Sequence, residues 1–209
     1  MITVVSGLGG CGSSMVMKMC LAAGLPPTGD ARASFWEDSR TVLLTSRSEN
    51  WKRRYDASWL DDCKGGVIKL LNPTVSVPPP RADWRWIWVD RDPEEMTKSQ
   101  LKISASLRKR RRPGRVEDWR RESLEVIERV GGEVLFLSYE QILDAPILHA
   151  TRLVDYIGKG DAGRVAAVVR KRSPKCSPEV DPDRQFSRLV ELPPAQKLAL
   201  VKAAMAGKL

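Results

Sequence analysis

A glycine-rich run, Gly7–Ser14, constrains the fold of this chain more than any other feature of its sequence. It follows a short apolar run, Ile2–Val5, and opens a segment, Ser13–Ala23, that is apolar nearly all round. A strand, a glycine loop and a helix in this order form an anion cradle, because backbone N–H groups and the positive end of the helix face the same place. The sequence therefore predicts a loop that binds phosphate or sulfate. A plain strand-to-helix turn is the alternative.

Three further apolar runs lack the polar alternation of half-exposed strands, as is typical of parallel strands covered on both faces. They are Gly66–Leu71, Trp86–Val89 and Val134–Leu137. Helix-like segments separate or follow them: Pro93–Leu107, Val116–Val130, Ile147–Ile157, Ala162–Arg172 and Pro194–Ala206. Strands alternating with helices predict an α/β fold. We expect one domain over residues 1–209, a three-layer doubly wound sheet of mainly parallel strands, with a helical C-terminal third.

Local signals support two of these helices and one of the strands. Asp92 before Pro93 is a natural N-cap with proline at the first helical position, and Gly131 is a plausible C-cap. Trp84, Trp86 and Trp88 alternate, so they share one face of a strand. We expect that face to lie in the core.

Composition limits the class of protein and its partners. The chain has 209 residues and a net charge of +9, which predicts an anionic partner. No apolar run approaches the roughly 18 residues of a membrane-spanning helix, and glycines follow the first strand-like run too soon for a signal peptide. The four cysteines form no CxxC pair and look like free thiols, which favours the cytoplasm and excludes a disulfide scaffold or zinc ribbon. They are Cys11, Cys20, Cys63 and Cys176.

Two familiar loop types fit the glycine run poorly. Gly7, Gly9 and Gly12 match a dinucleotide fingerprint, but Leu25–Gly29 contains two prolines and a glycine and cannot supply the second strand that this fold requires. A cysteine phosphatase loop needs an arginine where Met17 stands.

A nucleoside triphosphate loop fits better but lacks its main charge. Gly7, Gly12 and Ser14 match GxxxxGKS/T, yet Ser13 replaces the lysine that reaches the β- and γ-phosphates. Asp90 follows an apolar strand, as a magnesium-holding aspartate would. A P-loop kinase therefore remains an alternative.

Three segments resemble sulfotransferases, which are P-loop proteins without that lysine and use 3′-phosphoadenosine 5′-phosphosulfate (PAPS). Val5–Met15 resembles their 5′-phosphosulfate loop. Val89–Gln100 reproduces their second signature, a strand ending in arginine with a serine eight positions later, here Arg91 and Ser99. Leu135–Leu143 is similar to a strand and Tyr-Glu turn of the bacterial enzymes.

The resemblance implies a P-loop NTPase-like fold, PAPS as co-substrate and no metal. It implies that the loop holds the 5′-phosphosulfate through Gly9, Gly10, Cys11, Gly12, Ser13 and Ser14. Arg91 and Ser99 would grip the 3′-phosphate. At the end of a parallel strand, Arg91 would offer phosphate a bidentate fork.

The chain departs from this family at its catalytic groups. Gly10 stands where the family usually carries a basic residue, and Leu71 stands where the cytosolic enzymes place their histidine base. Lys69 is the candidate that replaces the missing cation, with a snorkelling strand-end lysine as the alternative. Glu37, in an aromatic-Glu element, is the candidate base, with an exposed loop glutamate as the alternative. We expect the only histidine, His149, to lie at the surface.

Two other features carry weaker expectations. Cys11 at a helix start should have a lowered thiol pKa and be sensitive to oxidation. The basic run Arg108–Arg115 fits a solvated helix end, and it could also hold an acidic acceptor or nucleic acid.

Together these features predict a sulfotransferase that moves a sulfuryl group from PAPS to a hydroxyl or amine. The acceptor would be a small molecule or glycan, and an anionic one would suit the charge. We expect neither a membrane nor nucleic acid as partner, and the sequence says nothing of oligomeric state. A kinase and a noncatalytic anion- or nucleic-acid-binding module are the alternatives.

Overall fold

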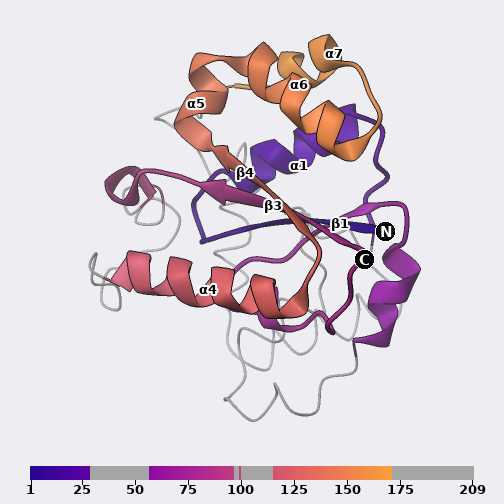
Figure 1. Cartoon of the computed structure of the whole chain (residues 1–209). Coiled ribbons are helices and arrows are strands. Elements are labelled where there is room, and N and C mark those ends of the chain that lie inside the picture. The colour runs from indigo at the N-terminus through magenta and orange to yellow at the C-terminus, as the bar shows by residue number, and fades with distance from the viewer. Residues whose placement is uncertain (29–56, 97–98, 100–114, 171–209) are drawn as a thin grey trace, which may run out of the picture.

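Four parallel strands form the sheet of this chain in the order β2-β1-β3-β4 (Figure 1). The computed structural model describes residues 1–28, 57–96, 99 and 115–170. The strands are β1 (Ile2–Gly7), β2 (Val67–Lys69), β3 (Trp84–Asp90) and β4 (Glu133–Ser138). The prediction of four parallel strands from unbroken apolar runs is confirmed.

The central strands are longer than the sequence predicts. β1 is buried along its whole length and pairs with β3 from Ile2↔Trp84 to Gly7↔Val89. β2 is shorter than predicted, and its register with β1 runs only from Thr3↔Val67 to Val5↔Lys69. Pairing with β3 extends β1 beyond its apolar run to Gly7, which the sequence assigned to the loop.

Helices cover both faces of the sheet (Figure 1). On one face lie α1 (Ser13–Ala22), α5 (Tyr139–Asp144), α6 (Pro146–Ile157) and α7 (Ala162–Ala167), and on the other lies α4 (Val116–Val130). This is the predicted α/β architecture with a helical layer on each side. α7 ends before the predicted Arg172, and the predicted helix 194–206 lies outside the described residues.

Two predicted helix ends are confirmed in detail. The Asp92 side chain accepts hydrogen bonds from the amides of Glu94 and Glu95, at 3.0 and 2.9 Å, and residues 93–96 and 99 are helical. Gly131 ends α4 with φ 88°, and its amide bonds the carbonyl of Ile127. These ends follow from local chemistry, which is why sequence locates them.

The tryptophans of β3 lie in the core, as predicted. Trp84, Trp86 and Trp88 are each at most 1% exposed. Their indole N–H groups donate to the carbonyls of Pro79 and Gly131, both at 2.9 Å, and to the Asp90 carboxylate at 2.7 Å. Each indole thus has a partner for its polar atom, as burial requires.

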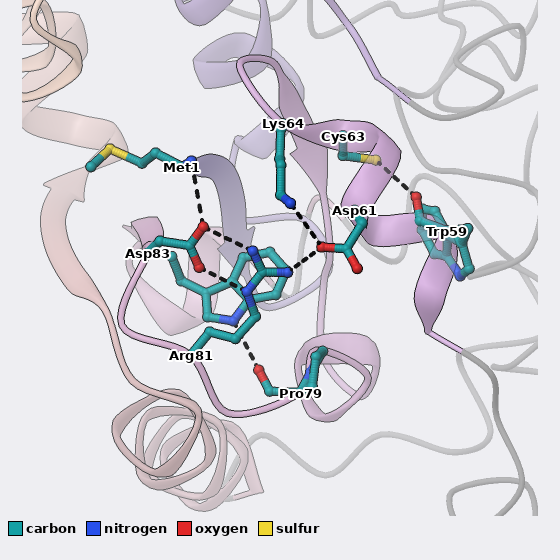
Figure 2. Close-up of polar contacts among 9 residues, drawn as sticks. Met1, Trp59, Asp61, Cys63, Lys64, Pro79, Arg81 and Asp83 are labelled. Carbon is teal, nitrogen blue, oxygen red and sulfur yellow. Dashed lines mark hydrogen bonds and ion pairs between the residues drawn. The ribbon is translucent and has the colours of Figure 1, made fainter.

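An ion-pair network fastens the amino ends of β1 and β3 to the short helix η2 (Ser58–Cys63) (Figure 2). Arg81 donates two hydrogen bonds to Asp83, at 2.7 and 2.8 Å, and also bonds Asp61. The Met1 amino group lies 3.5 Å from Asp83. The arginine lowers the pKa of both carboxyl groups below their usual range. This network lies at the sheet edge opposite the carboxyl ends of the strands.

Candidate functional site

The carboxyl ends of β1, β2 and β3 bring the glycine loop, Lys69 and Arg91 to one edge of the sheet. β1 and β3 are neighbours. α1, which follows β1, and α4, which lies between β3 and β4 in the chain, are on opposite faces of the sheet (Figure 1). Open α/β sheets bind ligands at such a reversal of direction, outside the carboxyl ends. Here that place is the glycine loop after β1, flanked by the ends of β2 and β3.

The glycine loop is tightly packed at two of its glycines. A Cβ at Gly7 would lie 2.7 Å from both the Cys11 sulfur and the Val89 carbonyl oxygen. Gly12, the N-cap of α1, has φ 100°, and a Cβ there would lie 2.3 Å from a ring carbon of Tyr139. Both positions require glycine, for space and, at Gly12, for the left-handed backbone as well.

The glycine loop is partly accessible to solvent. Gly9, Gly10 and Ser14 are half-buried, whereas Cys11 and Ser13 are buried. The backbone N–H groups of Gly10 and Gly12 have no hydrogen-bond acceptor within the part of the chain that the structure describes. These amides precede α1, whose N-cap has no side-chain hydrogen bond. An anion would satisfy such donors.

Lys69 brings a buried positive charge to the loop from β2. It is the last residue of that strand, is 3% exposed, and its Nζ donates to the Ser14 hydroxyl at 3.3 Å. Its charge also lowers the pKa of the neighbouring Cys11 thiol, although burial raises that pKa by more. The structure therefore places Lys69 beside the helix start, and the alternative of a lysine that snorkels into solvent is wrong.

Arg91 brings a second cation from the end of β3. Its side chain is 12% exposed, and Nη1 donates to the Gly10 carbonyl at 3.0 Å. Nε is buried and has no hydrogen-bond acceptor among the described residues; Oε1 of Glu140 lies 3.8 Å from it. A buried N–H without an acceptor is unfavourable, and an anionic ligand would supply one.

Ser99 is buried and helical, at 5% exposure. The predicted base Glu37 and the basic run Arg108–Arg115 lie outside the described residues. Ser13, predicted to hold the anion through its hydroxyl, is 4% exposed.

Asp90, the predicted magnesium ligand of the kinase alternative, is engaged by other side chains. Arg120 of α4 donates two parallel hydrogen bonds to it, at 2.8 and 2.7 Å, and the Trp88 indole donates a third at 2.7 Å. The bond raises the pKa of Arg120 above its usual range. A cation at Asp90 would have to displace a bidentate guanidinium.

Sequence reasoning missed Arg120. It lies in a helix rich in charge, and nothing in the sequence distinguishes it from the neighbouring Arg121, which is 67% exposed and pairs with Asp118 on its own helix. Only the docking of α4 against β3 selects Arg120 as the partner of Asp90.

A small pocket of about 100 Å³ lies between the loop, the end of β3 and the start of α4. Cys11, Asp90, Arg91, Glu117 and Arg120 are among the residues that line it. Its volume is below that of typical ligand pockets, so it can enclose only part of a nucleotide.

Two predictions about titratable residues are wrong. Cys11 was expected to have a lowered pKa, but it is 1% exposed and burial raises its pKa despite Lys69 and the Ser13 amide. His149 was expected at the surface, but it is 4% exposed on α6, and burial together with Arg152 lowers its pKa. In both cases the tertiary packing outweighs the local signal.

Comparisons with known proteins add no family. No protein-family model matches the chain, and no curated protein is significantly similar to it. In the described part of the chain, no group of three or more His, Cys, Asp or Glu residues could hold a metal ion. No described helix is long and apolar enough to cross a membrane.

Proposed function

We propose that this chain is a sulfotransferase that moves a sulfuryl group from PAPS to a hydroxyl or amine of a small-molecule or glycan acceptor. The observation that carries the proposal is the pairing of Lys69 Nζ with the Ser14 hydroxyl at the start of α1. This pairing supplies a cation at a glycine loop whose own sequence has none. The P-loop-like reading of the fold rests on the same observation.

Each group at the loop has a role that fits its position. Backbone amides of Gly9–Ser14 would bind the 5′-phosphosulfate, and Lys69 would stabilise the charge that develops on the sulfuryl group and its bridging oxygen. PAPS supplies the activated sulfuryl group, and the chain supplies position and electrostatics. Glu37 remains the proposed proton acceptor for the attacking hydroxyl or amine.

Arg91 would bind the 3′-phosphate, together with Ser99. One guanidinium has five N–H donors, so Arg91 can bond the Gly10 carbonyl and still offer a fork to phosphate. The same contact places a cation beside Gly10, where the family usually carries a basic side chain. Arg91 and Lys69 together would compensate for that replacement.

The kinase alternative is disfavoured by the environment of Asp90. A kinase needs this carboxylate for magnesium, whereas Arg120 and Trp88 already occupy both of its oxygens. The anion site would instead work through amides and cations alone. Cys11, Cys20 and Cys63 are buried, and within the described part of the chain none of them forms a disulfide, which fits a cytoplasmic protein.

A thermal-shift panel tests the proposal. It compares 3′-phosphoadenosine 5′-phosphate (PAP), AMP, ATP with magnesium, and NAD at matched concentrations. A ligand at about 100 times its Kd adds about 2.7 kcal/mol to the unfolding free energy, which corresponds to several degrees of Tm. We expect PAP to raise Tm most. A preference for ATP with magnesium would favour the kinase, and no shift with any ligand would contradict both.

A further inference from the structure

We infer that Tyr139 is a positioning residue that holds the glycine loop and Arg91 in a single arrangement. The inference goes beyond the individual anion-binding groups to what fixes them relative to one another. Its consequence for nucleotide binding rests on the proposed function, whereas its consequence for the loop itself does not.

Tyr139 reaches the site from the fourth strand of the sheet. It follows β4 directly and is the first residue of α5, whose N-cap Ser138 accepts a hydrogen bond from the Gln141 amide. Since β4 is parallel to β3, its carboxyl end meets the same edge as Arg91. The Tyr139 side chain is buried there, at 8% exposure.

One contact of the ring is with the loop. Tyr139 leaves no room for a Cβ at Gly12, where the nearest ring carbons would be 2.3 and 2.9 Å away. The Gly12 carbonyl accepts the first hydrogen bond of α1, from Met15 at 2.9 Å. The ring therefore packs against the residue that sets where the helix begins, and with it where the loop amides point.

The other contact of the ring is with Arg91. The guanidinium carbon lies 4.4 Å from the centre of the Tyr139 ring, within cation–π range. The next residue, Glu140, accepts hydrogen bonds at 3.2 Å from the Asp92 amide and from the Ser138 hydroxyl. Its carboxylate lies 3.8 Å from Arg91 Nε. The turn after β4 thus holds Arg91 through the Tyr139 ring and holds the next residue, Asp92, through the Glu140 carboxylate.

The glycine loop, Arg91 and Tyr139 thus each contact the other two. Arg91 bonds the carbonyl of Gly10, Gly12 packs on Tyr139, and Tyr139 packs on Arg91. Displacing the ring would release both sides at once. Among the described residues the Tyr139 hydroxyl makes no hydrogen bond, so the ring and not the hydroxyl carries the effect.

The test compares Tyr139→Phe, which keeps the ring, with Tyr139→Leu, which removes it. We expect Tyr139→Leu to bind PAP about 10- to 100-fold more weakly and to lose much of the preference for PAP over AMP, because both halves of the site move. Tyr139→Phe should stay close to the wild type. Global unfolding midpoints for both variants would show whether the fold is retained. If Tyr139→Leu does not fold, Tyr139→Met fills the volume with a flexible apolar chain and takes its place.

A second readout needs no nucleotide. Amide hydrogen exchange in the unliganded protein should be faster over residues 8–15 and 90–92 in Tyr139→Leu, and unchanged there in Tyr139→Phe. Unchanged exchange over these residues in Tyr139→Leu would overturn the inference, whatever binds. Absence of PAP binding by the wild type would instead overturn the proposed function, and the exchange comparison would still decide the role of Tyr139.

Discussion

At the scale of single residues, the two cations at the loop have different expected roles. Lys69 lies at the helix start, where the sulfuryl end of the co-substrate would bind, and Arg91 lies at the end of β3. Their substitution should therefore separate ligands that differ in one group.

Lys69→Met removes the charge and retains most of the volume. We expect it to weaken PAPS binding by about 10-fold or more, which corresponds to the loss of one charge-assisted contact. PAP binding should weaken less, because PAP lacks the sulfuryl group. Isothermal titration with both ligands measures the difference. Equal weakening of both would show that Lys69 acts on the loop as a whole and not at the sulfuryl end.

Cys11 should react slowly despite its place at a helix start. Burial raises its pKa and covers the sulfur, so little thiolate is present or accessible at pH 8. We expect thiol reagents to modify Cys11 at the rate of local or global opening, far below the rate for a free cysteine. Peptide mapping after timed alkylation measures this, and rapid labelling of the native protein would contradict it.

Sequence located the candidate residues but not their partners. The glycine loop and Arg91 can be recognised from the sequence because each follows a strand directly in the chain. The Asp90–Arg120 pair and the packing of Tyr139 on Gly12 are not, because each joins segments far apart in the chain. Cys11 and His149 were misjudged for the same reason, since burial is set by the tertiary fold.

At the scale of elements, the docking of α4 onto β3 explains why the Asp90 carboxylate is paired with the Arg120 guanidinium. Arg120 and Asp90 are both partly exposed, at 38% and 34%, so their pair stabilises the protein only modestly.

We expect Arg120→Ala to lower the free energy of unfolding by about 1 kcal/mol, and Asp90→Asn with Arg120→Ala to show coupling between the two sites. Arg121→Ala, on the same helix and 67% exposed, is the matched control and should change stability little. Denaturant unfolding gives the values. Additive effects of the single changes would contradict a coupled pair.

Element boundaries show how far local signals extend. α4 ends where the sequence predicts because Gly131 stops it. The helix from residue 93 begins where the sequence predicts because Asp92 caps it. α7 stops earlier than predicted, at Ala167, since no such signal marks its end. The strand lengths depend on pairing with neighbours, which sequence periodicity does not contain.

At the scale of the whole molecule, buried titratable groups set the pH range of stability. Burial lowers the pKa of His149 below its ordinary 6.5, so stability is lost as the pH falls below that value and the unfolded state takes up a proton. Burial raises the pKa of Cys11 and Cys20 above 9.0, and that of Tyr156 above 10.0. Their contribution is present below these values and is lost as the pH rises.

We therefore expect the free energy of unfolding to be highest between about pH 7 and 9 and to fall on both sides. His149→Gln should flatten the curve between about pH 5 and 7 and leave the alkaline side unchanged, while the fall at lower pH from Asp61 and Asp83 remains. Urea unfolding across the pH range measures the curve. An acid side that His149→Gln does not change would show that carboxyl groups alone determine it.

The central claim is that one edge of the sheet recognises a nucleotide by its 3′-phosphate through Arg91. Isothermal titration of PAP and of AMP into the wild type and Arg91→Ala tests it most directly, with Arg121→Ala as the control. The account predicts that the wild type and Arg121→Ala bind PAP at least about 10-fold more tightly than AMP, and that Arg91→Ala abolishes this preference while the protein remains folded. Equal affinity of the wild type for the two nucleotides, or an undiminished preference in Arg91→Ala, would contradict it.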